Sequence, residues 1–165
     1  MPPKTERTDK KEVEAIVLDY LQWGYAGDKR PLNQREPIIL AVGTDQFKLL
    51  ELTAKKDKAI NLHDVVYIGD GERKVVDRVK RRVSFAELTP TAKGELEPAV
   101  AEIISASEAR FVEFYNTAVP VSLKMHMLNL LPGFGKKTLT DTLTEREKKP
   151  FESFADIKAR VKTLQ

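Results

Sequence analysis

The chain has 165 residues, of which 41% are hydrophobic and 32% are charged, and its formal net charge is +3. This composition predicts a globular protein with a real core and excludes a chain too polar to fold. The absence of cysteine excludes disulfides and thiolate metal sites, and fits a cytoplasmic protein. No apolar run is long enough to span a membrane, and residues 1–10 predict a mobile tail, not a secretory signal.

Residues 11–88 show the periodicity and turn chemistry of short β-strands. The expected strands are 13–20, 38–42, 47–53, 65–68 and 74–83, with a longer loop at 23–37. Strand number, strand length and total size favour a small five-stranded OB-like β-barrel. Oligonucleotide binding is a frequent use of that fold, although a fold alone does not establish a function.

Residues 89–165 predict an all-α domain, so the fold class is α+β. A helix can begin at Thr89 or Pro90, and apolar residues recur at helical spacing over 99–115. Ser122 is expected to cap a helix that reaches residue 131, and a further helix is expected over 136–147. The last helix is predicted after Ser153, with inner residues Ile157, Val161 and Leu164.

The chemistry of the segment 131–137 (LPGFGKK) points to a phosphate. Proline ends the preceding helix, and the two glycines let the backbone approach another molecule closely. The next helix then begins with free N–H groups and a positive dipole end, which favour an anion. These contacts read no base, so the binding is expected to lack sequence specificity. The predicted nucleic-acid-binding residues here are Gly133, Phe134, Gly135, Lys136, Lys137 and Thr138.

The positive charge is concentrated in the same part of the chain. Residues 121–165 contain nine Lys and Arg and five Asp and Glu, a net charge of +4, whereas the other 120 residues have a net charge of −1. Such clustering is expected of a phosphate-binding surface. A thermophile surface rich in Lys and Glu is the alternative explanation.

Two resemblances support this interpretation. Residues 131–137, together with 149–157, resemble the helix-hairpin-helix superfamily. The whole chain resembles an uncharacterised archaeal family predicted to bind RNA, through residues 63–69, 128–137 and 150–161. The resemblance implies an OB-like barrel followed by a helix-hairpin-helix domain, and an RNA or DNA ligand with RNA slightly favoured.

A second basic surface is predicted on the strand 74–83. Alternation places Arg78, Lys80 and Arg82 on one face, roughly 6.5 to 7 Å apart, close to the phosphate spacing of a single strand. Protection of an exposed sheet edge is an equally good explanation. Four aromatic residues are candidates for stacking bases or, more commonly, for the core: Trp23, Tyr25, Phe47 and Tyr67.

Other functions have weaker support. The segment 135–138 (GKKT) lacks the spacing of a nucleotide-binding P-loop. Asp64, Asp70 and Glu72 lie near a turn and leave a metal-dependent nuclease as a minor alternative. A protein-interaction module of a ribosomal or transcription assembly is the main alternative. The sequence thus predicts a binding protein without catalytic residues, cofactor or metal.

Overall fold

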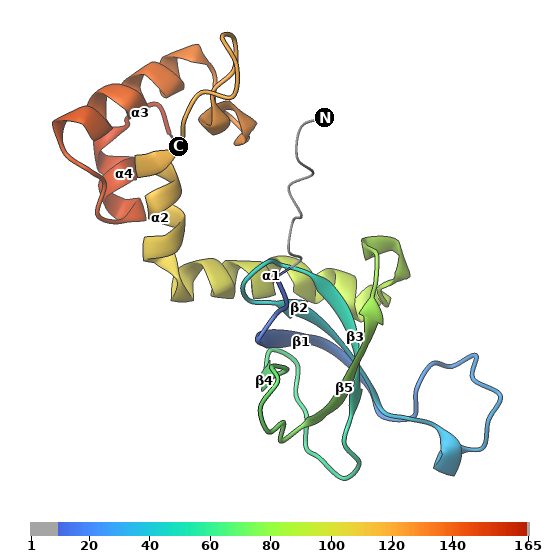
Figure 1. The fold of residues 1–165 in the computed structure, drawn as a ribbon. Helices are drawn as coiled ribbons and strands as arrows, with labels where there is room; N and C mark the ends of the chain where they lie inside the picture. Colours follow the sequence, from blue (N-terminus) through green and yellow to red (C-terminus); the bar gives the residue numbers. More distant parts are fainter. Residues whose placement is uncertain (1–9, 165) are drawn as a thin grey trace, which may run out of the picture. The chain divides into compact units, whose positions relative to one another are not determined.

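The computed structural model describes residues 10–164, which form a mixed α+β fold with a curled, five-stranded antiparallel sheet and four α-helices (Figure 1). The expected mobile tail, except Lys10, lies outside the described residues. The elements are β1 (Glu14–Leu21), η1 (Leu32–Gln34), β2 (Ile38–Gly43), β3 (Leu49–Ala54), β4 (Val65–Tyr67), β5 (Val76–Arg82), η2 (Phe85–Glu87), α1 (Pro90–Ala106), α2 (Glu108–Thr117), η3 (Met127–Leu130), α3 (Lys136–Lys148) and α4 (Phe154–Arg160).

The five predicted strands are confirmed, each within about two residues of its expected bounds. They are ordered β4-β1-β2-β3-β5, and all neighbours are antiparallel. Within the described residues, β4 pairs only with β1 and β5 only with β3, so the sheet is open between its two edge strands. The predicted loop between β1 and β2 is also present and projects from the sheet in Figure 1.

The central strand β2 is buried on both faces, which explains its uninterrupted apolar sequence. Ile39 and Ala41 belong to the apolar cluster on one face of the sheet, whereas Leu40 and Val42 belong to the cluster on the other face. Residues of α1 complete the second cluster: Ala92, Ala99 and Ile103. Burying each large side chain contributes roughly 1.5 to 3 kcal/mol, so both faces stabilise the fold.

Helix α1 begins where the sequence predicted a helix start. Thr89 Oγ1 accepts a hydrogen bond from the amide of Ala92 at 3.1 Å and donates one to Asp19 Oδ2 at 2.6 Å. The chain divides into two compact units after Ile103, whereas the sequence placed the boundary at residue 89. The difference arises because α1 packs on the sheet and therefore belongs mostly to the first unit.

The second unit contains α2, α3 and α4 and has two apolar clusters of its own. The expected helix over 99–115 is divided, because Ser107 leaves helical geometry at φ −125° and ψ 37°. The predicted cap of the last helix is confirmed, since Ser153 Oγ accepts from the amide of Asp156 at 2.9 Å. Ile157 and Val161 are buried in this unit, as expected.

The expected helix after Ser122 is wrong. Ser122 Oγ accepts from the amide of Lys124 at 3.3 Å, and the amide of Val121 donates to the carbonyl of Met125, so the chain closes a tight loop there. Leu123, one residue after the expected cap, is fully exposed. Helical structure is limited to the single turn η3.

Candidate nucleic-acid interface

The segment Leu131 to Lys137, here called the hairpin, is anchored in the second unit by Phe134. The amide of Phe134 donates to the carbonyl of Leu131 at 3.2 Å, and its side chain is only 8% exposed. The ring packs with Leu128 and lies 6.2 Å from the ring of Tyr115, centroid to centroid. Its side chain therefore holds the hairpin in place and does not line the surface where the sequence placed it.

Two glycines leave the backbone of the hairpin open. A Cβ atom added to Gly133 or Gly135 would meet no protein atom within 4 Å. Gly133 needs to be glycine because its φ is +80°, a conformation that side chains disfavour. Gly135 has φ −87°, which any residue adopts, so its missing side chain has no conformational explanation. The exposed backbone at Gly135 is accessible to another molecule.

Helix α3 begins immediately after Gly135, and no side chain of the described residues caps its N-terminus. Its first residues, Lys136 and Lys137, are exposed and form no ion pair within residues 10–164. Three basic residues farther along the unit are paired: Lys148 with Glu145, Lys149 with Glu152, and Arg160 with Glu145 and Asp156. The unneutralised charge therefore includes the pair at the start of α3.

Thr138 does not occupy the position expected for a ligand-contacting hydroxyl. Its side chain lies on the inner face of α3 and is 7% exposed, and its carbonyl accepts from Thr142 Oγ1 at 2.7 Å. Phe134 and Thr138 are thus corrections to the predicted contact set. The glycines and lysines of that set remain on the surface.

Two residues that the sequence did not single out for this site support the hairpin. His126 Nδ1 accepts from the amide of Leu128 at 3.1 Å, and Asn129 connects the amide of His126 to the carbonyl of Phe134. Burial, together with the positive charge of Arg146, lowers the pKa of His126. Polar residues of a short turn carry no sequence signal for this role.

The predicted basic stripe on β5 is wrong, because the strand does not alternate regularly. Its register against β3 shifts twice, between Arg81 and Val79 and between Arg78 and Val76. Arg78 faces Thr53 across the strands, whereas Arg82 faces Leu50 on the opposite face of the sheet. Arg78, Lys80 and Arg82 therefore do not form one row.

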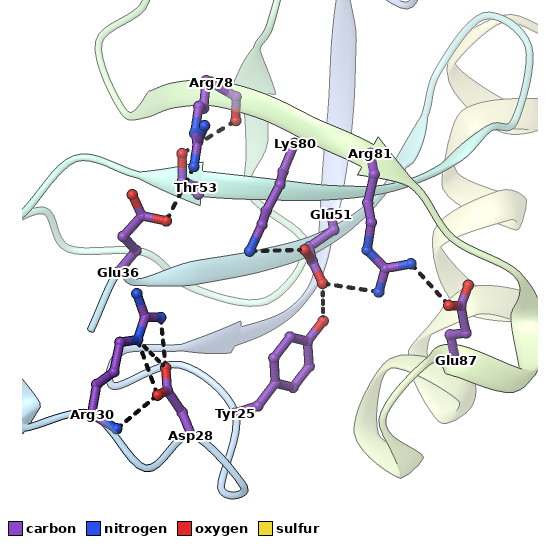
Figure 2. Close-up of polar contacts among 10 residues, drawn as sticks. All are labelled: Tyr25, Asp28, Arg30, Glu36, Glu51, Thr53, Arg78, Lys80, Arg81 and Glu87. Atoms are coloured by element: carbon purple, nitrogen blue, oxygen red, sulfur yellow. Dashed lines mark hydrogen bonds and ion pairs between the residues drawn. The ribbon is translucent and has the colours of Figure 1, made fainter. Parts of the chain in front are cut away.

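Carboxylates of the same unit neutralise most of these cations (Figure 2). Arg78 pairs with Glu36 at 3.3 Å, and Lys80 and Arg81 pair with Glu51 at 3.6 and 3.4 Å. Glu51 is 1% exposed. A buried charge of this kind requires partners, so the pairs are structural. Within the described residues, Arg82 is the member of the predicted stripe without a carboxylate partner.

The four aromatic candidates have different surroundings. The Tyr25 hydroxyl donates to Glu51, and burial together with this bond raises the pKa of Tyr25 to about 12. Phe47 packs against the cluster shared with α1. Trp23 is 53% exposed in the loop after β1, and Tyr67 is 40% exposed on the edge strand β4.

Residues 10–164 contain no group of three or more His, Asp or Glu side chains arranged to hold a metal ion. None of the helices in that range is both long enough and apolar enough to cross a membrane.

A family model described as "Protein of unknown function (DUF655)" matches residues 11–165. The chain belongs to the DUF655 family. It is 42% identical over 159 residues to an uncharacterised protein of the archaeon Methanocaldococcus jannaschii, covering 96% of this chain and 71% of the relative. It is also similar to the crystal structure of a protein from Archaeoglobus fulgidus, ascribed to DUF655, with a TM-score of 0.87 and 46% identity. That match covers 93% of this chain and 85% of the other, so the two share one fold.

Proposed function

We propose that this DUF655 protein binds nucleic acid without sequence specificity, through backbone phosphates at the hairpin. The observation that carries the proposal is the start of α3, where an open glycine, an uncapped helix N-terminus and two unpaired lysines meet. Backbone amides and the helix dipole favour an anion there, and Lys136 and Lys137 add the charge that holds a phosphate. None of these groups reads a base edge.

The surrounding fold supports the proposal. The hairpin followed directly by α3 supports assignment of residues 121–161 to the helix-hairpin-helix superfamily, with the single turn η3 in place of a full first helix. The curled five-stranded sheet, open at one side, supports an OB-like barrel in the first unit. Both are folds that commonly contact nucleic acid, and the resemblance to an archaeal family predicted to bind RNA favours RNA slightly over DNA.

The experiment compares the wild-type chain with Lys136→Ala/Lys137→Ala on short single- and double-stranded RNA and DNA across a salt series. The wild-type affinity is expected to fall steeply with salt, and the variant should lose affinity and roughly 1.5 to 2 units of the logarithmic salt slope. Lys158→Ala/Lys162→Ala is a matched control, because it removes two exposed lysines of the same unit outside the hairpin. Equal losses in both variants, or none in the hairpin variant, would overturn the hairpin assignment.

A protein-interaction module is the second candidate, and one observation favours it. Five large apolar side chains are between 46% and 108% exposed in the short stretch before the hairpin: Val119, Val121, Leu123, Met125 and Leu130. Apolar patches of this kind commonly mark interaction sites. Binding of a ribosomal or transcription protein there should be lost in Val121→Ser/Leu123→Ser and should persist in high salt and in the lysine variant.

A further inference from the structure

A cavity of about 700 Å³ lies at the opening of the sheet, where the edge strands β4 and β5 do not pair. Tyr67 lines it from β4, Val79 and Arg82 line it from β5, and Lys11 lines it from the segment before β1. Its volume lies within the range of protein sites for small organic groups. We call it the seam groove.

The seam groove has an excess of positive charge. Its cationic lining residues are Lys11, Lys48, Arg73, Arg82 and Arg78, of which Arg78 is paired with Glu36. The lining carboxylates are Glu12 and Asp70, and the carboxylate of Glu12 is already hydrogen-bonded to backbone amides. It is 5% exposed, and its oxygens accept from the amides of Asp45 at 2.9 Å and Gln46 at 2.6 Å. The groove therefore complements an anion.

Tyr67 gives the groove a fixed aromatic surface. Its hydroxyl accepts from the amide of Gly71 at 2.9 Å, and Arg73 Nε donates to the carbonyl of Gly69 at 2.9 Å in the same turn. A Cβ atom added to Gly69 or Gly71 would lie 2.5 or 2.8 Å from the Tyr67 hydroxyl, so both glycines make room for the phenol. The turn at 69–71 thus fixes the hydroxyl end of the ring, and the residue is 40% exposed.

We propose that the seam groove binds single-stranded nucleic acid, with a base stacked on Tyr67 and the adjoining phosphates at Lys11, Arg73 and Arg82. The proposal extends the nucleic-acid binding proposed above, but it concerns a different site on the first unit. Aromatic faces and cations in one groove are the combination that single-stranded nucleic acids use, because every base has a face to stack and every linkage has a charge. An acidic peptide would need the cations but would not need the aromatic ring.

Photo-crosslinking locates the contact on the wild-type chain. An RNA octamer with 4-thiouridine in place of uridine is irradiated with the protein, which is then digested with trypsin. A contact at the groove labels the tryptic peptide 59–73, whereas a contact at the hairpin labels the peptide 125–136. We expect label in 59–73, at Tyr67. Label confined to other peptides would overturn the groove proposal and leave the hairpin proposal unaffected.

Variants then test the two components of binding, with fluorescence anisotropy on a uridine octamer and on an abasic phosphodiester of equal length. Tyr67→Leu should weaken binding of the uridine octamer about 10-fold or more and leave abasic binding unchanged, whereas Tyr67→Phe should retain affinity. Arg82→Gln should weaken both ligands and lower the salt slope by about one unit. Lys58→Gln is the charge control, because Lys58 is exposed and does not line the groove. Thermal unfolding checks that each variant is folded.

The same titrations in a Lys136→Ala/Lys137→Ala background separate the two proposals. If Tyr67→Leu does not weaken binding of the uridine octamer in either background, the groove proposal is overturned. If Tyr67→Leu weakens that binding but Lys136→Ala/Lys137→Ala does not change oligonucleotide affinity, only the hairpin site is overturned. No binding of any oligonucleotide by the wild-type chain would overturn both proposals. The groove proposal would also be overturned by an acidic peptide whose binding is lost in Arg82→Gln but kept in Tyr67→Leu.

Discussion

His63 Nε2 lies 2.5 Å from Oε2 of Glu95, so the connection before β4 is linked to α1 by an ion pair. The other ring nitrogen, Nδ1, lies 3.0 Å from Oε1 of Glu102, which is about two turns farther along the same helix. One imidazole thus faces two carboxylates of the same helix. The backbone of His63 has φ +68°, so the residue sits in the left-handed region to make this contact.

This relationship makes stability depend on pH. The hydrogen bond with Glu95, supported by Glu102, raises the pKa of His63 above its usual 6.5. A group whose pKa is raised by folding stabilises the folded state fully below the unfolded pKa, and this contribution is lost as pH rises through the folded pKa. The contribution of His63 to the free energy of unfolding should therefore decline from pH 6 towards pH 9, by about 1 kcal/mol for a partly exposed pair.

His63→Asn isolates the effect, because asparagine tolerates the left-handed conformation but cannot become charged. The difference in unfolding free energy between wild type and variant, measured by urea denaturation, should be greatest at pH 6 and small at pH 9. Taking the difference cancels His126, whose lowered pKa gives the opposite dependence. A constant difference over this range would show that the ion pair does not contribute.

Glu51 is expected to stabilise the first unit and hold its longest loop. Glu51→Gln removes the charge that Lys80 and Arg81 face, and should cost about 1 to 3 kcal/mol of unfolding free energy because these partners are partly exposed. It also weakens the bond from Tyr25, so trypsin should cut the 22–37 loop faster. Glu87→Gln removes an exposed partner of Arg81 and serves as the control, with an expected cost well below that of Glu51→Gln. Equal stability of the two variants would contradict the prediction.

The strands were predictable because their signals are local: alternation, turn residues and an apolar central strand. The pairing of charges on β5 was not, because its partners Glu36, Glu51 and Glu87 come from three separate segments. The two register shifts likewise arise from pairing with β3. One signal was present, since Glu51 is the one charged residue of a strand that is otherwise uncharged and mostly apolar, and a buried charge needs partners.

The position of the hairpin was predicted from its Pro and Gly residues, but the directions of its side chains were not predicted. Phe134 stands between two glycines, and its burial depends on Tyr115 and Leu128, which no local pattern connects with it. Ser122 Oγ does accept from the amide of Lys124, as a helix cap would, but no helix follows, because the amides of Val121 and Ser122 donate to the carbonyl of Met125 and turn the chain back. The seam groove was not predicted as a site because it joins β4, β5 and the segment before β1.

Asn116 is expected to stabilise the second unit. Its Nδ2 donates to the carbonyl of Phe151 at 2.9 Å, and its Oδ1 accepts from the amide of Phe151 at 2.7 Å, which fixes the chain before α4 against α2. Asn116→Asp keeps the acceptor but places a carboxylate oxygen against a carbonyl, so it should lower the unfolding free energy by about 1 to 3 kcal/mol. Thr117→Ala, at an exposed neighbouring position, should cost much less in the same thermal unfolding measurement. A similar loss in both variants would argue against the bridge.

The two hairpin glycines separate stability from binding. Gly133→Ala forces a side chain into φ +80° and should cost about 1 to 2 kcal/mol of unfolding free energy. Gly135→Ala meets no protein atom and keeps an ordinary φ, so its stability should stay within about 0.5 kcal/mol of wild type. If phosphates approach the backbone there, the added methyl group should nevertheless weaken oligonucleotide binding several-fold, because it occupies the space that the ligand needs. Normal binding by a stable Gly135→Ala variant would mean that no ligand contacts this backbone, whichever lysines contribute charge.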